Sequence, residues 1–359
     1  MDKGKLKAAI LGCGNISVAH YNAIKANSHK VELYAVCDII EEKAIAAAEK
    51  YGAAKYYTDY KEMLKDENID FVSICTPSGM HGEMAVDCAK AGKHVLCEKP
   101  IDVTHEKLDK IVEAFENTNL KFGGVFQYRT YPGILKAKRM LENGELGNVY
   151  IGDGYCKIYR SPEYYKSADW RGTWKLDGGG CLMNQGIHTL DILCWLMGGV
   201  VSTQAKTFTL AREIEVEDTA FAFLKFKNGG YGTFTGTTLA HPGTGVKVEI
   251  ICEKGKIVFQ DPNTYLYQVD ENGKEVEICL DTIETEERNS EENKEVINTA
   301  NDPAALSLTG HTFLVSNLVN AILENKQTHV GPEEARHTVD VILAIYESSR
   351  TGKEIFIKS

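Results

Sequence analysis

Short apolar runs alternate with helical stretches over the first 125 residues, and this alternation limits the fold more than any other feature of the chain. The runs have the composition of strands buried on both faces, and they lie at residues 7–11, 31–37, 71–75, 94–97 and 122–126. Such alternation is typical of βαβ units and a parallel sheet. The right-handed crossover rule then leaves few alternatives to a doubly wound α/β sheet, which we predict for residues 1–125.

The pattern changes after about residue 127. Helices are expected near 132–143, 187–197, 307–323 and 333–350, and consecutive strand-like runs lie between 220 and 259. Runs of strands without helices between them indicate an antiparallel sheet. A chain of 359 residues also exceeds the size at which one core usually stops growing. We therefore predict a second, α+β domain over residues 126–359.

Composition and charge narrow the classes of partner. The chain is 43% hydrophobic and 25% charged, as in ordinary globular proteins, and its formal net charge is −11. A phosphate backbone or an anionic membrane surface needs clustered Lys and Arg, so neither nucleic acid nor membrane is an expected partner. No apolar run approaches the ~20 residues of a membrane span and no signal sequence follows Met1, so we expect a cytoplasmic protein. The acidic stretch at 281–295 is expected to be a solvated loop.

Ten cysteines are scattered along the chain without a Cys-x-x-Cys pair or the His/Cys spacing of a zinc site. Most lie inside apolar runs, as Cys37 and Cys75 do. We expect them to be small buried hydrophobic residues in a reducing compartment, and we predict no metal site.

The first apolar run ends in a glycine turn of the dinucleotide-binding type. Residues 12–17 read Gly-x-Gly-x-x-Ser, with serine in the place of the third glycine or alanine of the fingerprint. Gly12 allows a tight turn, Gly14 lets the backbone approach a pyrophosphate, and Asn15 and Ile16 lead into a helix whose N-terminus attracts anions. The sequence therefore predicts a Rossmann-type cofactor site at this turn.

Asp38 ends the second apolar run, 38 − 14 = 24 residues after Gly14. That spacing is near the one expected of an acid that binds the ribose hydroxyls of a dinucleotide. Ile39 and Ile40 follow, with no arginine or serine to receive a 2′-phosphate, so NAD is favoured over NADP. The alternative for Asp38 is an N-cap of the helix that begins near Glu41.

A lysine stands where a parallel sheet opens onto its ligand crevice. Glu98, Lys99 and Pro100 directly follow the apolar run at 94–97, and ligands of open α/β sheets sit outside the carboxyl ends of the strands. Pro100 has a fixed φ, which stiffens the turn that carries Lys99. The alternative is a solvated lysine before a turn proline.

Thr76, Pro77 and His81 close another strand at the same edge of the sheet. Residues at this edge are candidates for contact with the cofactor. The alternative is ordinary helix capping by Ser78, with His81 on an exposed first turn.

Three segments carry a family resemblance: residues 76–81 (Thr-Pro-Ser-Gly-Met-His), residues 91–100, which include Glu-Lys-Pro, and residues 178–191, which include Asn184 and His188. With the glycine turn, they resemble the glucose-fructose oxidoreductase and inositol dehydrogenase family (Gfo/Idh/MocA), in the right order over most of the chain. The motifs are closest to those of its nucleotide-sugar and inositol dehydrogenase-like members. The resemblance implies a second domain with a large open sheet that makes subunit contacts, hence a homodimer or homotetramer.

The resemblance also implies the chemistry. Family members oxidise or reduce a secondary alcohol of a sugar, cyclitol or nucleotide sugar with a nicotinamide cofactor. The lysine of their Glu-Lys-Pro motif, here Lys99, is catalytic, and its bond to the proline, here Pro100, is often cis. Four residues before the catalytic histidine, here His188, the family usually has Asp, whereas this chain has Asn184, as in a subset that resembles nucleotide-sugar dehydrogenases.

Hydride transfer from a carbinol carbon needs a base for the hydroxyl proton, and histidine, here His188, ordinarily titrates near neutrality. Helical spacing also presents Asn184 and Asp191 beside His188. We expect Lys99 to stabilise the developing alkoxide, and Asn184 to hold the hydroxyl or to fix the imidazole. Asp191 either orients His188 by a hydrogen bond or faces solvent.

Aromatic and arginine side chains gather in the sequence after residue 127. Rings stack on sugar faces or bases and guanidinium groups bind carboxylate or phosphate, so an anionic or nucleotide-linked sugar is the expected substrate. The alternative is an aromatic-rich core and dimer surface. The residues expected to bind substrate are Lys99, Tyr128, Arg129, Tyr159, Arg160, Trp170, Arg171, Asn184 and His188. Those expected to bind the cofactor are Gly12, Gly14, Asn15, Ile16, Asp38, Thr76, Pro77, His81, Glu98, Lys99 and Gln127.

Two functions of other classes stay open beside the NAD-dependent dehydrogenase. One is a cofactor-sensing, non-catalytic regulatory protein of the same fold, against which the joint presence of Lys99 and His188 argues. The other is a structural subunit with a vestigial pocket, which has no use for an intact Gly12, Gly14 and Asp38 set. Within the enzyme hypothesis, NAD either exchanges or stays bound and shuttles hydride between two substrates.

Overall fold

The structure is a computed structural model that describes residues 4–281 and 308–357. The chain divides into two compact units. Of the described residues, unit 1 contains 4–127, 175–178 and 308–339, and unit 2 contains 128–174, 179–281 and 340–357. The solvated loop predicted for 281–295 lies outside the described residues, apart from its first position.

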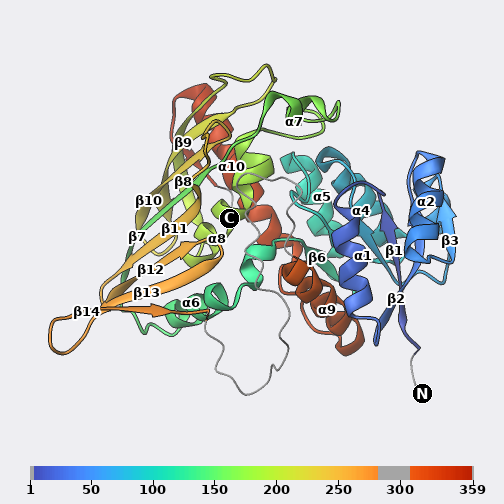
Figure 1. Cartoon of the computed structure of the whole chain (residues 1–359), viewed down its shortest axis with the longest axis horizontal. Helices are drawn as coiled ribbons and strands as arrows, with labels where there is room; N and C mark the ends of the chain where they lie inside the picture. Colours follow the sequence, from blue (N-terminus) through green and yellow to red (C-terminus); the bar gives the residue numbers. More distant parts are fainter. Residues whose placement is uncertain (1–3, 282–307, 358–359) are drawn as a thin grey trace. The chain divides into compact units, whose positions relative to one another are not determined.

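Unit 1 is built on a six-stranded parallel sheet with the order β3-β2-β1-β4-β5-β6 (Figure 1). The strands are β1 (Leu6–Leu11), β2 (Val31–Cys37), β3 (Lys55–Tyr57), β4 (Phe71–Ile74), β5 (His94–Cys97) and β6 (Phe122–Gly124). This order places the switch point of the sheet between β1 and β4. The predicted doubly wound parallel sheet is therefore confirmed.

Helices connect these strands, and local sequence signals set their ends. The Thr104 side chain accepts a hydrogen bond from the Lys107 N–H and so caps the start of one helix, while Gly52, at a φ of 72°, ends another. The helices of unit 1 are α1 (Ser17–Ala26), α2 (Glu41–Tyr51), α3 (Tyr60–Leu64), α4 (His81–Lys90), α5 (His105–Phe115) and α9 (Leu308–Glu324), with a 3₁₀ turn η1 (Ser78–Met80).

Helix α9 belongs to unit 1 although it follows unit 2 in the sequence. It packs beside α1, from the opposite end of the chain (Figure 1). Leu314 and Leu318 of α9 are fully buried in the same core cluster as Ile10 and Ile24. The sequence analysis placed all residues from 126 onward in the second domain, because the apolar periodicity of a helix indicates that it packs but not against which element.

Unit 2 contains a nine-stranded sheet with the order β14-β13-β12-β11-β7-β10-β9-β8-β15 (Figure 1). The β7·β10 pair is parallel and its other strand pairs are antiparallel. This confirms the predicted α+β domain with a large, mostly antiparallel sheet. The strands are β7 (Val149–Lys157), β8 (Val200–Phe208), β9 (Thr219–Phe226), β10 (Tyr231–Thr237), β11 (Gly245–Cys252), β12 (Gly255–Gln260), β13 (Asn263–Val269), β14 (Glu275–Cys279) and β15 (Ile355–Phe356).

Helix α8 (Ile187–Leu196) packs closely on the sheet because glycines of β7 leave room for it. A Cβ atom on Gly152 would lie 2.7 Å from the Met197 side chain, and one on Gly154 would lie 3.2 Å from Leu193. The other helical segments are the 3₁₀ turn η2 (Gln127–Thr130), α6 (Pro132–Glu142), α7 (Pro162–Lys166), the π-helical turn η3 (Cys181–Gly186) and α10 (Pro332–Thr351), which begins in unit 1 and ends in unit 2.

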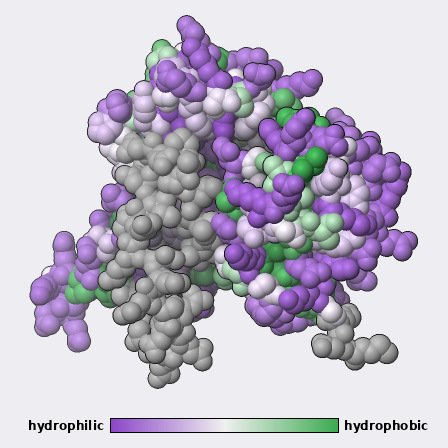
Figure 2. Space-filling model, turned by 45° about the vertical axis from the view of Figure 1, so that its right-hand side comes forward, coloured by the Kyte–Doolittle hydropathy of each residue, from purple (hydrophilic) through white to green (hydrophobic). Residues whose placement is uncertain are grey.

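The polarity of the surface and the burial of the cysteines agree with what the composition predicts. Hydrophilic side chains predominate on the face shown in Figure 2, and hydrophobic ones gather there in small patches. Among the described residues, no helix combines the length and apolar character that crossing a bilayer requires. Eight of the ten cysteines are buried, as expected, while Cys13 and Cys279 are half-buried.

Candidate functional site

The glycine turn after β1 is shaped for a close ligand. Gly12 has a φ of 97°, and a Cβ there would lie 2.8 Å from the Cys75 carbonyl oxygen. Gly14 and Asn15 are exposed, and nothing lies within 4 Å of the place where a Gly14 Cβ would be. Ile16, half-buried, precedes the first residue of α1. The turn therefore leaves the backbone at the N-terminus of α1 open to an anion such as a pyrophosphate.

Asp38, directly after β2, stabilises this turn by hydrogen bonds. Its carboxylate accepts hydrogen bonds from the N–H groups of Cys13 and Ile40, each at 2.9 Å. The N-cap of helix α2 is Ile40, which forms no side-chain cap. The alternative that Asp38 is the N-cap of this helix is therefore wrong. The half-exposed carboxylate retains acceptor capacity for ribose hydroxyls.

His81 is buried and joins the ends of two strands. It is 1% exposed, so the alternative of a histidine on an exposed first turn is wrong. Its ring nitrogens lie 2.7 Å from the carbonyl oxygens of Thr76, after β4, and of Pro100, after β5. Thr76 and Pro77 themselves are half-buried at this edge of the sheet.

Lys99 follows β5 at the same edge, and it is half-buried. The Lys99–Pro100 peptide is cis, as the resemblance implied. Glu98 was expected to contact the cofactor, but the residue is only 6% exposed and its side chain has protein partners.

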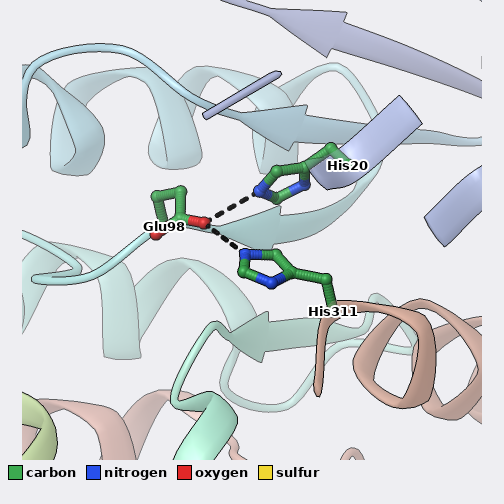
Figure 3. A group of neighbouring side chains, drawn as sticks. All are labelled: His20, Glu98 and His311. Atoms are coloured by element: carbon green, nitrogen blue, oxygen red, sulfur yellow. Dashed lines mark hydrogen bonds and ion pairs between the residues drawn. The ribbon is translucent and has the colours of Figure 1, made fainter. Parts of the chain in front are cut away.

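The Glu98 carboxylate lies between two histidines that are far away in the sequence (Figure 3). Its Oε1 is 2.9 Å from Nε2 of His20, on α1, and 3.1 Å from Nε2 of His311, on α9. Burial alone would raise the pKa of Glu98, but the hydrogen bonds to both histidines hold this pKa well below its usual value. The sequence analysis missed His20 and His311 because no local pattern links them to Glu98.

These three side chains are also the group, among the described residues, whose ligand atoms are close enough to hold a metal ion. Both nitrogen–oxygen distances are those of hydrogen bonds. A metal-ligating histidine normally donates its other N–H to an acceptor, and in the described part of the chain Nδ1 of His311 has no partner. The geometry therefore fits a hydrogen-bonded triad better than a metal centre.

In unit 2, Asn184 lies in η3 and His188 lies one turn later in α8, and both are half-exposed. Glu217 holds the start of η3. Its carboxylate accepts hydrogen bonds from the N–H groups of Gly180 and Leu182 at 2.9 Å. Single π-helical turns occur often at functional sites, so the arrangement marks this segment independently of any motif.

Arg129 and Asp191 form a buried ion pair. Nε and Nη2 of Arg129 lie 2.7 and 2.6 Å from the two oxygens of Asp191, and the residues are 3% and 0% exposed. Asp191 therefore does not face solvent, and the Arg129 guanidinium holds η2 to α8 although a substrate contact was expected. Tyr128 is also buried, with its ring 5.5 Å from that of His188, whereas Gln127 is half-buried at the end of unit 1.

Aromatic rings hold the arginines of the second predicted group. The Arg171 guanidinium carbon lies 4.3 Å from the ring centroid of Tyr164 and 4.7 Å from that of Trp170. Arg160 lies 5.4 Å from the Tyr164 ring and donates to the carbonyl oxygen of Tyr159. The structure therefore brings Arg160 and Arg171 together at the Tyr164 ring, with Trp170 beside Arg171. The Tyr159 ring instead stacks on His241, 4.3 Å away.

Comparison with known sequences decides the family. Residues 6–124 match the sequence model described as "Oxidoreductase family, NAD-binding Rossmann fold". Residues 134–258 match the one described as "GFO/IDH/MocA C-terminal domain". The chain belongs to the GFO/IDH/MocA oxidoreductase family.

Several proteins similar to this member of the GFO/IDH/MocA family are named dehydrogenases. The myo-inositol 2-dehydrogenase of Thermotoga maritima is 27% identical over 259 residues, which are 70% of this chain and 74% of the relative. The WlbA dehydrogenase of Bordetella pertussis, solved in complex with NADH and UDP-GlcNAcA, is 30% identical with a TM-score of 0.81, and 99% of both chains is covered. A levoglucosan dehydrogenase in complex with NADH shares the fold at 21% identity, with a TM-score of 0.86 over 99% of this chain and 100% of that one.

Family membership confirms the predicted NAD-dependent oxidoreductase. The described residues fit this cofactor: the Gly14 backbone is open at the N-terminus of α1, and the Asp38 carboxylate closes the adjacent strand. No phosphate-binding arginine follows Asp38 in the sequence. The residue types at this edge therefore favour NAD, as the sequence predicted.

Glu217 gives a prediction on pH and stability. Burial raises its pKa from 4.5 to about 7 against the opposing hydrogen bonds from the N–H groups. The folded protein then binds a proton that the unfolded chain releases near pH 4.5, so stability is lost as the pH rises through 7. We expect the wild type to lose about 3 kcal/mol more unfolding free energy than Glu217→Gln between pH 4.5 and 8.

Urea unfolding across this pH range measures the difference. Glu213→Gln, which changes an exposed carboxylate in the same region, is the matched control and should keep the wild-type dependence. An unchanged pH dependence in Glu217→Gln contradicts the prediction.

Proposed function

We propose that this member of the family oxidises or reduces a secondary alcohol of a sugar derivative with NAD, using Lys99 and His188 as catalytic residues. The observation that carries the proposal is the position of Lys99 at the edge of the sheet where Gly12 and Asp38 also lie. In doubly wound sheets this edge is where the ligand binds. The relatives named above act on inositol or levoglucosan, or were solved with UDP-GlcNAcA.

The proposed chemistry assigns one task to each side chain. The cofactor, when bound, supplies the acceptor for the hydride. His188 takes the hydroxyl proton in the direction of oxidation and returns it in the direction of reduction. The Lys99 ammonium stabilises the negative charge that develops on the oxygen, and Asn184 holds the hydroxyl. With Asn184 in place of an acid, no carboxylate at that position competes for the proton.

We further propose that the substrate carries an anionic group, such as the diphosphate of a nucleotide sugar. Arg171 is held by neutral partners, since its Nη1 donates to the hydroxyl of Tyr164 and its plane lies near the rings of Tyr164 and Trp170. Among the described residues it has no carboxylate partner. A guanidinium positioned in this way retains its charge for a ligand.

An exposed aromatic face on unit 2 supports the proposal of a homodimer or homotetramer. Phe221 and Phe223 on β9 and Tyr231 on β10 are 51%, 50% and 46% exposed, and the Phe223 and Tyr231 rings stack at 5.7 Å. A solvated sheet face usually carries polar side chains, and contiguous apolar patches mark interaction sites. A second copy of the chain is the proposed partner, and the cytoplasm is the proposed location.

The catalytic proposal predicts the effect of removing the ammonium. Lys99→Ala should lower kcat/KM about 10²–10³-fold and leave NAD affinity nearly unchanged, because the charge acts on the transition state. Absorbance of reduced nicotinamide, with a panel of sugars, inositols and nucleotide sugars, measures turnover. The surface variant Lys90→Ala is the control. Saturable NAD binding without turnover of any panel member would favour the cofactor-sensing alternative, and a single turnover would favour a tightly held cofactor.

The proposal of an anionic substrate predicts that one substitution changes KM for a charged substrate but not for a neutral one. Arg171→Gln should raise KM for a nucleotide sugar about tenfold or more, and should change KM for a neutral inositol little, because one charge-assisted contact is lost. Steady-state kinetics with both substrates give the comparison, and Arg139→Gln on the exposed side of α6 is the control. Equal effects on the two substrates would remove the anion argument.

The aromatic face predicts the state of assembly. The double variant Phe221→Ser, Phe223→Ser should shift sedimentation towards the monomer, because it removes the largest apolar side chains of β9 from the face. Val269→Ser, an exposed change on β13 of the same sheet, should leave the sedimentation coefficient unchanged. A wild-type protein that sediments as a monomer at micromolar concentration refutes this assignment.

A further inference from the structure

The triad of His20, Glu98 and His311 has a second connection, to Lys99. While Oε1 of Glu98 faces both histidines, its Oε2 lies 3.2 Å from the backbone N of Lys99. The side chains of His20, Glu98 and His311 are 0%, 8% and 3% exposed, so solvent does not supply their hydrogen bonds. One buried carboxylate thus joins α1, α9 and the turn that carries Lys99. Figure 3 shows its contacts with the two histidines.

The donors of the triad can be assigned from its contacts. Hydrogen bonds keep the Glu98 carboxylate ionised, so each Nε2 atom that faces it must carry a proton. Burial lowers the pKa of His20, whose neutral ring then accepts from the Ser73 hydroxyl at Nδ1, at 3.2 Å. The carboxylate therefore receives N–H groups from two rings and from the Lys99 backbone. Removing one donor leaves a buried acceptor with fewer partners, and the side chain then moves.

We propose that His20 and His311 are positioning residues for Lys99: they fix the Glu98 carboxylate, whose second oxygen fixes the Lys99 backbone. This inference rests on the proposed catalytic role of Lys99. It makes a residue of helix α9, 213 positions from Glu98 in the chain, necessary for the reaction rate. A displacement of about 1 Å at a catalytic group is enough to cost about a hundredfold in rate.

Substitutions at His311 distinguish the effect of its side-chain volume from the effect of its N–H donor. His311→Gln retains an N–H near the position of Nε2, whereas His311→Leu fills the space without a donor. Asn317→Ala is the control on the same helix. The Asn317 side chain accepts a hydrogen bond from the His329 N–H at 2.7 Å, so this variant removes a contact of α9 that lies outside the triad. Glu98→Gln tests the carboxylate itself.

We expect His311→Leu and Glu98→Gln to lower kcat about tenfold or more, with the KM for NAD little changed, because the glycine turn is not altered. His311→Gln should recover most of the kcat lost in His311→Leu. Asn317→Ala should lower the urea midpoint while kcat stays within about twofold of the wild type. The inference is overturned if kcat in His311→Leu equals that of the wild type, if Gln does not rescue, or if kcat follows the urea midpoint across all variants.

A readout without turnover separates this inference from the proposed function. Trace acetylation by acetic anhydride, followed by mass spectrometry, gives the reaction rate of the Lys99 amine relative to that of exposed Lys110 on α5. We expect this ratio to change about twofold or more in His311→Leu, less in His311→Gln and not in Asn317→Ala. A changed ratio without turnover of any panel sugar by the wild type would sustain the positioning role and refute the proposed reaction. Wild-type turnover with an unchanged ratio and unchanged kcat would refute the positioning role alone.

Discussion

A buried carboxylate needs hydrogen-bond donors around it, and this requirement organises both units of the protein. In unit 1, Glu98 gathers donors from α1, from α9 and from its own turn. In unit 2, Glu217 holds the start of η3, and the two oxygens of Asp191 accept from Nε and Nη2 of Arg129. Each acid thereby fixes a segment that carries a candidate catalytic residue, Lys99 or His188. These three acids are buried, and their hydrogen bonds go to the protein itself.

The features that the sequence predicted depend on neighbours in the chain. The turn at Gly12 requires a φ that glycine favours, and its backbone passes too close to the carbonyl oxygen of Cys75 for a Cβ atom. Six consecutive residues are therefore enough to predict this turn. Asp38 and Lys99 each follow an apolar run directly, and the rule for the carboxyl ends of parallel strands then brings them to one edge. The five strands predicted for unit 1 agree within two residues with β1, β2, β4, β5 and β6, because hydrophobic periodicity is a local property, whereas the short β3 was not predicted.

The features that the sequence did not predict depend on contacts between distant segments. Nothing near His311 indicates that it meets Glu98, and nothing near Glu217 indicates that it caps a turn 35 or more residues earlier. Arg129 has the residue type of a ligand for anions, and only the fold reveals that Asp191 occupies it. A buried ion pair and a binding arginine have the same sequence signature, so burial must distinguish them.

The position of α9 in unit 1 has a consequence for synthesis on the ribosome. Strands β1 to β6 are translated first, whereas Leu314 and Leu318, which complete their core, are translated after β7 to β14. The apolar surface that α9 will cover is therefore exposed on the nascent chain while more than half of the protein is still being made. Such surface attracts chaperones and promotes aggregation. The half of the protein that binds the nucleotide is begun first and reaches its native core only near the end of translation.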